Sequence, residues 1–326
     1  GAWLHDCGKV TTPEYVVDKA SKLETIYNRI HEVRMRFEVL IRDAWVDYYK
    51  ALADHPDAKE TLAETRDTTI TALRDDFAFI AECNVGGEFM ADEKIERLNA
   101  IAQRTWTRHL DNRIGLSQLE TQRMERTSAP TLPVEEPLLS DRPDHIIERP
   151  VPAEHYFGDN ALGFTSPVPE HLYNLGELYN LSIKRGTLSE EDRFKINEHV
   201  IETIRMLNLL PFPDHLKRVP EYAGNHHETM IGSGYPRGLT ADQLTIPERI
   251  MGLADIFEAL TAADRPYKTP KTLTQALKIM TFMIKDGHLD SDLFELFLKS
   301  GVFRDYADTY LRADQIDDVK IDAFIQ

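Results

Sequence analysis

The chain has 326 residues, of which 42% are hydrophobic and 29% are charged, and its mean hydropathy is −0.41. These values are typical of a folded globular protein and argue against a disordered or membrane-embedded chain. The formal net charge of −17 argues against a broad surface for duplex DNA or RNA, because contacts to phosphates need clustered cations. A small anionic ligand stays compatible with this charge wherever a few cations converge.

The cysteine content indicates the compartment. Cys7 and Cys83 are too few for a disulfide framework, so we expect a reducing, cytoplasmic location. The sequence has no apolar run of membrane-spanning length and no signal-peptide pattern. It opens at Gly1 without a methionine, immediately before a polar motif, so we expect the natural protein to continue upstream.

Residues 19–126 show apolar side chains at steps of three and four, which predicts a series of amphipathic helices. A capping box of Ser117 and Glu120 predicts the start of the last one. Long helices of this kind form a bundle or a dimer interface more often than a catalytic lid, so this region is our candidate surface for a homodimer. The predicted helices cover about 19–53, 58–83, 92–109 and 117–126.

A proline-rich segment follows. Residues 130–170 hold eight of the chain's 17 prolines, which leaves little room for helix or central strand and predicts a connector. Helical periodicity then returns, with no strong strand signal anywhere, so the predicted fold class is all-α. The expected helices of this second half cover about 190–210 and 247–263, with two or three more between 273 and 325.

Two short motifs carry imidazoles. His5 and Asp6 place an imidazole beside a carboxylate, with the amine of Lys9 close to one helical turn away from Asp6. Taken alone, such a pair is more often a surface or structural feature than a site. His226 and His227 are adjacent, so on a helix their side chains would point about 100° apart and could serve different metals. A solvated histidine pair before a Gly-Pro turn is the alternative.

Two further polar residues interrupt apolar helices. Asp255 lies inside the nearly apolar segment 250–260, where an unpaired buried carboxylate is costly and a bound metal is one good reason for it. A salt bridge is the alternative, while a capping role is at odds with the mid-helix position. His199 lies beside an apolar stripe, and by itself it is more often a core histidine than a ligand.

Together these residues supply nitrogen and oxygen donors without a thiolate, which suits Fe, Mn or Zn better than Ca or Mg. Six such groups suggest two metals, and a two-metal site with a bridging carboxylate fits hydrolysis of a phosphoester. The amine of Lys9 could then neutralise the phosphate. The six candidate ligands are His5, Asp6, His199, His226, His227 and Asp255.

The order of the motifs resembles the HD-GYP family of bacterial HD-domain phosphohydrolases. The resemblance covers residues 1–23 and about 172–300, with the intervening part as an insertion. The implied fold is a helical HD bundle, divided into 1–23, an insertion over 24–129, a connector over 130–171, and the remainder over 172–326. The matching pieces are His5-Asp6-x-Gly8-Lys9, His199, His226-His227-Glu228, Gly234-Tyr235-Pro236, Ala254-Asp255 and Asp264-Arg265-Pro266-Tyr267-Lys268.

The resemblance implies hydrolysis of cyclic di-GMP to a linear dinucleotide or GMP by a cluster of two or three Fe or Mn ions. It assigns Asp6 and Lys9 to catalysis, with Lys9 on the scissile phosphate, and the six candidate ligands to the metals. It assigns Tyr235, Arg265 and Lys268 to nucleotide contacts, and for the two cations we prefer this role over the alternative, a charge preference at a helix C-terminus. The implied partner is a sensor domain upstream, which could anchor the full-length protein in a membrane.

Two departures from the family pattern keep alternatives open. Ile231 stands where the family usually has an aspartate, so one acidic group beside the site is absent. The family's domain also begins with upstream helices that carry further metal-binding residues, which this sequence does not include. A degenerate domain that binds a cyclic dinucleotide or a partner protein without turnover is therefore one alternative. An HD phosphohydrolase acting on another nucleotide is the other.

Overall fold

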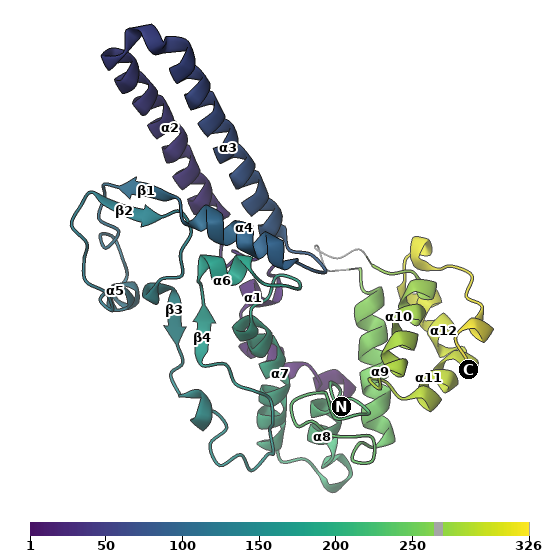
Figure 1. Cartoon of the computed structure of the whole chain (residues 1–326). Helices are drawn as coiled ribbons and strands as arrows, with labels where there is room; N and C mark the ends of the chain where they lie inside the picture. The colour runs from purple at the N-terminus through teal and green to yellow at the C-terminus, as the bar shows by residue number, and fades with distance from the viewer. Residues whose placement is uncertain (264–269, 326) are drawn as a thin grey trace. The chain divides into compact units, whose positions relative to one another are not determined.

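The structure is a computed structural model that describes residues 1–263 and 270–325. It confirms the all-α class, since helices dominate and the strands among the described residues are short (Figure 1). Contacts divide the chain into two compact units. The first unit comprises Gly1–Pro13, Glu154–Val168 and Phe194–Gln326, and the second comprises Glu14–Ala153 and Pro169–Arg193. The domain boundaries predicted from sequence, 1–23, 24–129, 130–171 and 172–326, stay predictions.

The most extended feature of the second unit is an antiparallel hairpin of α2 (Ile30–Asp54) and α3 (Lys59–Val85) (Figure 1). The predicted break between them is confirmed. The predicted start near residue 19 is wrong, because the chain forms turns before Ile30. The carboxylate of Glu24 accepts hydrogen bonds from the backbone amides of Ala20 and Ser21 at 3.0 and 2.9 Å, which favours a turn over a helix.

Shorter helices complete this unit. The capping box predicted at Ser117 is confirmed, since its hydroxyl accepts from the amide of Glu120 while the Glu120 carboxylate accepts from the amide of Ser117. The helix predicted over 92–109 ends at Ala102, because the residues after it pair as a strand. The helices are α1 (Glu14–Val17), α4 (Asp92–Ala102), α5 (Gln118–Met124) and α6 (Glu177–Leu181).

Within residues 1–263 and 270–325, four short strands form two antiparallel ribbons, which the sequence did not predict. β1 (Thr105–Arg108) pairs with β2 (Val134–Pro137), and β3 (Ile146–Glu148) pairs with β4 (His171–Asn174). In a two-stranded ribbon every strand is an edge strand, so a proline such as Pro137 is tolerated at a strand end. Strands this short carry too little alternation to be recognised from sequence.

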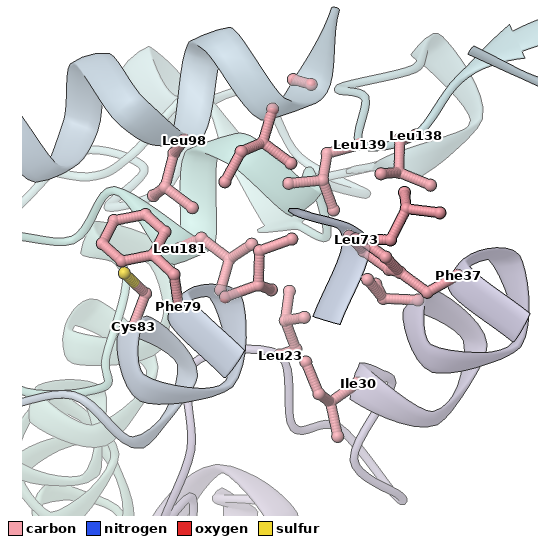
Figure 2. Close-up of a cluster of buried hydrophobic side chains, with 14 of the residues drawn as sticks. Leu23, Ile30, Phe37, Leu73, Phe79, Cys83, Leu98, Leu138, Leu139 and Leu181 are labelled. Carbon is pink, nitrogen blue, oxygen red and sulfur yellow. The ribbon is translucent and has the colours of Figure 1, made fainter. Parts of the chain in front are cut away.

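The core of the second unit combines side chains from the predicted helical insertion with side chains from the predicted connector and from the segment after it (Figure 2). Side chains of α2, α3 and α4 pack there against Leu138 and Leu139 of the proline-rich segment and against Leu181 of α6. Burial of a leucine side chain contributes about 1.5–3 kcal/mol. The proline-rich segment is therefore a packed part of the fold at these positions.

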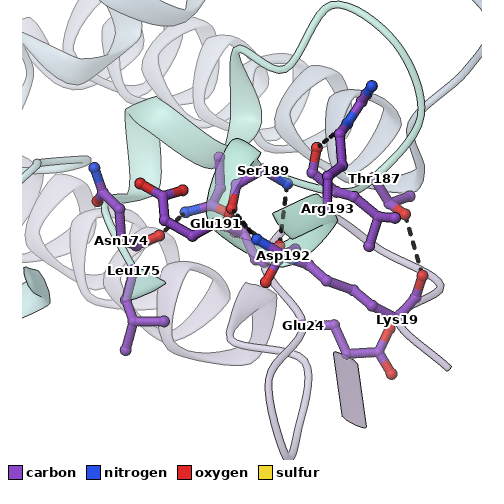
Figure 3. A network of polar contacts seen from close by, with 12 residues as sticks. Lys19, Glu24, Asn174, Leu175, Thr187, Ser189, Glu191, Asp192 and Arg193 are labelled. Atoms are coloured by element: carbon purple, nitrogen blue, oxygen red, sulfur yellow. Dashed lines mark hydrogen bonds and ion pairs between the residues drawn. The ribbon is translucent and has the colours of Figure 1, made fainter. Parts of the chain in front are cut away.

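A polar network fixes the beginning of α7 (Glu190–Asn208) within the same unit (Figure 3). The ammonium of Lys19 lies 2.7 Å from the carboxylate of Asp192, and both side chains are nearly buried. That carboxylate also accepts from the amide of Ser189, and the hydroxyl of Thr187 donates to the carbonyl of Lys19. An acidic side chain in the first turn also interacts favourably with the helix dipole.

Lys22 of the second unit is almost fully buried, and its ammonium has no carboxylate partner among the described residues. The ammonium donates to the carbonyls of Leu181 and Ile183, both at 2.8 Å, and touches the Met90 sulfur at 3.3 Å. Burial lowers the pKa of Lys22 to about 8, from 10.5. Below pH 8 the folded state therefore carries the cost of a buried charge.

We predict that this cost is relieved as the pH rises. Between pH 8 and 10.5 the folded state loses the proton first, so the unfolded state binds more protons and stability increases with pH. The free energy of unfolding of the wild type, relative to Lys22→Met, should rise by about 3 kcal/mol across this window. Denaturant unfolding at several pH values measures it, with Lys50→Met as the exposed-lysine control. A difference that stays flat or falls would contradict the prediction.

The first unit contains the later helices. The helices predicted over 190–210 and 247–263 are confirmed, and three helices lie between residues 273 and 325. Their core includes Leu253, Phe257, Leu277, Phe294 and Phe303. None of the helices of residues 1–263 and 270–325 combines the length and apolar character that crossing a bilayer demands. The helices are α7 from Phe194 onward, α8 (Val219–Gly224), α9 (Ile246–Thr261), α10 (Leu273–Lys285), α11 (Ser291–Lys299) and α12 (Val302–Tyr310).

Candidate metal centre

The His-Asp turn at the N-terminus is held against α7 by one buried threonine. The hydroxyl of Thr203 accepts a hydrogen bond from the amide of Gly8 at 2.9 Å and donates one to the carbonyl of His5 at 3.1 Å. Thr203 is fully buried, one helical turn after His199. A Cβ atom at Gly8 would lie 1.9 Å from the carbonyl oxygen of His199, so only glycine allows this approach. The contact brings Asp6 beside His199.

The paired histidines follow α8 in a turn that packs closely on α9. A Cβ atom at Gly252 of α9 would lie 2.8 Å from the carbonyl oxygen of His226, so glycine permits this packing too. His226 is buried and its ring centroid lies 4.1 Å from that of His227. Asp255, one helical turn after Gly252, lies 3.5 Å from the Nε2 atom of His5. All six candidate ligands therefore come together in the first unit.

Three of the imidazoles are oriented by the backbone in the same way. The Nδ1 atom of each lies within hydrogen-bond distance of the carbonyl three residues earlier, at 2.7 Å for His5, 2.5 Å for His199 and 2.7 Å for His226. A carbonyl only accepts, so each Nδ1 carries the proton and donates it. In the neutral ring the Nε2 atom then presents its lone pair, as metal-binding histidines do.

These lone pairs face a carboxylate. The Oδ1 atom of Asp6 lies 3.2 Å from Nε2 of His199 and 3.9 Å from Nε2 of His226. Within the described part of the chain, these three atoms are buried and have no hydrogen-bond partner. Three buried acceptors facing one another are unfavourable unless a cation lies among them. The donor set therefore fits a divalent metal ion.

The charge states support this interpretation. Burial lowers the pKa of His226 to about 4 and that of His227 to about 3, so both rings are neutral near pH 7. Burial alone would raise the pKa of Asp6, but His5 and Lys9 beside its Oδ2 atom help to bring it well below its usual range. Neutral imidazoles and an ionised carboxylate are the forms in which these groups bind metals.

His5 differs from the other rings. Its Nε2 atom lies 3.3 Å from Asp6 and 3.5 Å from Asp255, and the carboxylates of Asp255 and then Asp6 raise the pKa of His5 to about 10. A metal ion on this side would have to displace a proton, so its binding would release one. His5 thus lies on the side of the cluster that carries both carboxylates.

The donor atoms fall into two groups that share one histidine. One group consists of His199, His226 and His227, and the other of His5, Asp6 and His226, with the donor atoms of each group within 4.8 Å of one another. Asp6 faces both, because its Oδ1 atom is directed to His199 and its Oδ2 atom to His5. One carboxylate with its two oxygens on two donor groups is the arrangement of a bridging ligand.

The predicted catalytic and substrate residues lie at the edge of this cluster. The ammonium of Lys9 is 2.6 Å from Asp6, and its side chain is 47% exposed, so it can still reach a ligand. The ring of Tyr235 stacks on that of His227 with centroids 4.8 Å apart. Burial, and then Asp255 and Asp6, raise the pKa of Tyr235, which keeps its hydroxyl protonated. Arg265 and Lys268 lie outside the described residues.

Ile231, the departure from the family pattern, is exposed and pairs through its backbone with Thr240. Its side chain lies against Gly287, where a Cβ atom would be 2.5 Å from it.

Sequence reasoning assigned no role to Glu228, although it is part of the motif. The buried Glu228 carboxylate accepts from the amides of Arg237 and Leu239 at 2.7 and 2.8 Å, and so closes the loop that carries Tyr235.

Thr203 was also missed. Its sequence signal is a polar residue four positions after His199, inside the apolar stripe of the same helix.

A helical fold with a mixed histidine and carboxylate cluster of this kind is that of a metal-binding protein.

Residues 133–293 match the HD domain family, and the similarity to cyclic dinucleotide phosphodiesterases supports the HD-GYP type for this part of the chain. One relative is a 3'3'-cGAMP-specific phosphodiesterase of Vibrio cholerae, 36% identical over 40% of this chain and 30% of its own length. Another is a cyclic di-GMP phosphodiesterase of Thermotoga maritima, 33% identical over 43% and 38%. A cyclic di-GMP phosphodiesterase of Pseudomonas aeruginosa is 31% identical over 36% and 27%. The chain thus spans well under half the length of these relatives.

Proposed function

We propose that this chain hydrolyses a cyclic dinucleotide in a metal-dependent reaction, as the output domain of a bacterial signalling protein. The observation that carries the proposal is the set of three buried, unpaired acceptors of Asp6, His199 and His226 at the centre of six candidate ligands. The HD family implies a divalent metal, and three relatives are named phosphodiesterases of cyclic dinucleotides.

The proposed metal ligands are the six residues of the cluster, with Asp6 as the bridge and His226 shared between the two groups. The donors are nitrogen and oxygen without a thiolate, so we propose Fe or Mn, two or three ions per chain. Bound ions would supply Lewis-acid chemistry, lowering the pKa of water and neutralising charge on the phosphate.

The side chains around the cluster have separate proposed roles. Lys9 would place its ammonium on the scissile phosphate, since it already lies against Asp6 and stays exposed. Tyr235 would contact the nucleotide from its stack on His227. Arg265 and Lys268, outside the described residues, remain proposed nucleotide contacts. The reaction adds water across one phosphodiester bond, which leaves a linear dinucleotide and, after the second cleavage, GMP.

The first test is turnover by the whole natural protein, purified without oxygen and loaded with Fe(II) or Mn(II). Cyclic di-GMP and 3'3'-cGAMP are supplied separately, and the products are separated by chromatography. We expect a linear dinucleotide or a mononucleotide from at least one of them, and none after a chelator has removed the metal. Faster turnover of 3'3'-cGAMP would favour the second substrate, which the Vibrio cholerae relative supports.

A binding domain without turnover is the competing function. It is supported by Ile231, which replaces the acidic residue of the family pattern. This function predicts tight cyclic dinucleotide binding that persists in chelator, with no product from the metal-loaded protein. Rapid turnover would eliminate it.

The remaining partners are also proposals. An upstream sensor domain fits the short coverage of the relatives, one of which is named a response regulator. A homodimer through residues 24–129 stays a prediction, and the exposed Met35, Val46 and Tyr49 of α2 support it. Analytical ultracentrifugation of the whole protein, with and without substitutions at these three residues, would test it. A cytoplasmic location rests on the two free cysteines.

A further inference from the structure

Residues Glu154–Val168 pack inside the first unit, although the sequence places them in the proline-rich connector. We call this segment the strap. Phe164 of the strap is buried against α7, in a cluster with Phe194, Ile201 and Ile204. Tyr235, the tyrosine stacked on His227, packs against the same cluster. The strap and the candidate metal centre therefore share a hydrophobic contact.

The strap is braced by its own side chains. The amide nitrogen of the Asn160 side chain donates to the carbonyl of Phe164, and its oxygen accepts from the Phe164 amide, both at 2.8 Å. Asn160 has a φ of +50°, a conformation that asparagine tolerates better than most residues. Tyr156 adds an edge contact to Phe194, with ring centroids 5.6 Å apart. The strap is thus a defined loop, and further backbone groups of it remain to bond outside the strap.

Two of those backbone groups hold the loop that follows Tyr235. The amide of Thr165 donates to the carbonyl of Pro236 at 2.8 Å. In the other direction, the Nε atom of Arg237 donates to the carbonyl of Leu162 at 2.9 Å. These bonds attach the strap to the two residues immediately after Tyr235.

Arg237 also connects this loop to the paired histidines. Its backbone amide donates to Glu228 at 2.7 Å, and its guanidinium donates to the side chain of Asn225 at 3.3 Å. Asn225 and Glu228 directly flank His226 and His227 in the sequence. One guanidinium therefore contacts both the strap and the turn that carries two candidate ligands. The fork of an arginine can make such divergent bonds, and a single ammonium cannot match their geometry.

We propose that Arg237 is a positioning residue, through which the strap holds Tyr235 in its stack on His227 and so sets the nucleotide-facing side of the centre. The inference rests on the proposed phosphodiesterase function. The hydrogen bonds that Arg237 donates within the described part of the chain go to Leu162, Asn225 and Glu228, none of which is a candidate ligand, so its effect falls on the placement of Tyr235. A displacement of about 1 Å in a substrate-positioning group is enough to lower turnover about 100-fold.

Arg237→Gln in the whole protein tests the inference. We expect kcat/KM for the cyclic dinucleotide to fall about 10- to 100-fold while metal content per chain stays at the wild-type value. Backbone amides of residues 235 and 237–239 should exchange hydrogen faster, and those of α9 should not change. Arg237→Lys should recover part of the activity. Arg218→Gln, an exposed arginine paired with Glu221 in the same unit, is the matched control and should match the wild type.

A second variant links the effect to the strap. Asn160→Gly keeps the positive φ while removing the brace, so it should reproduce the Arg237→Gln phenotype more weakly. In the double variant the two losses should not add, because both act through the same contact. Wild-type kcat/KM and unchanged exchange in Arg237→Gln would overturn the inference, as would a loss of metal in proportion to activity. Failure of the proposed function is distinct, since the wild type would then give no product whatever the exchange shows.

Discussion

An Asp6→Asn variant is expected to lose bound metal and to turn over cyclic dinucleotide about 1000-fold more slowly, which corresponds to about 4 kcal/mol. The reason is the position of both carboxylate oxygens. Oδ1 lies 3.2 Å from Nε2 of His199, and Oδ2 lies 3.3 Å from Nε2 of His5 and 2.6 Å from the ammonium of Lys9. An amide keeps only one acceptor, places an NH₂ donor where the other oxygen was, and removes the negative charge.

The measurement is metal content by elemental analysis, together with the rate of product formation by the same metal-loaded sample. Asp214→Asn is the matched control, because Asp214 is an exposed aspartate of the same unit, paired with Lys217. The control should keep both metal and activity. If Asp6→Asn kept its metal and its rate, the proposed bridging role would be wrong, and the cluster would have to bind metal through the histidines alone.

The candidate site was predictable because its candidate ligands lie in short, local motifs. His5-Asp6, His199, the His226 pair and Asp255 are each unusual for their surroundings, and a shared metal explains why such donors occur together. The structure brings these side chains into one cluster, while their service as ligands stays a proposal. Thr203 and the strap, which sequence reasoning missed, act through contacts between distant segments, and the polar position of Thr203 in an apolar stripe does not indicate its partner.

The fold shows the same division between local and distant information. The α2–α3 hairpin and α9 were predicted because sustained apolar periodicity specifies helices locally. The start of α2 was predicted too early, because the apolar Leu23 fits a helical spacing but packs in the core from a turn. Likewise β1 and β2 exist only through pairing with each other, across a separation of about 30 residues in the chain.

Gly8 offers the second large effect, because it tests how the His-Asp turn reaches α7. In Gly8→Ala the new Cβ atom would lie 1.9 Å from the carbonyl oxygen of His199 and 2.7 Å from the amide nitrogen of Thr203. Both neighbours are helical backbone, which cannot give way as a flexible side chain would. The turn must therefore retreat from α7 by roughly 1.5 Å to restore ordinary contact, and it carries His5 and Asp6 with it.

We expect Gly8→Ala to lower turnover about 100-fold and stability by about 1–3 kcal/mol. The group of His199, His226 and His227 does not include the turn, so metal content should fall without vanishing. Elemental analysis and denaturant unfolding measure the two effects. Gly87→Ala is the matched control, since no atom lies within 4 Å of a Cβ there. A Gly8→Ala protein with full metal content and wild-type turnover would contradict this prediction. It would show that the site does not need the close approach of the turn to α7, and that the carboxylate of Asp6 reaches the histidines from a more distant turn.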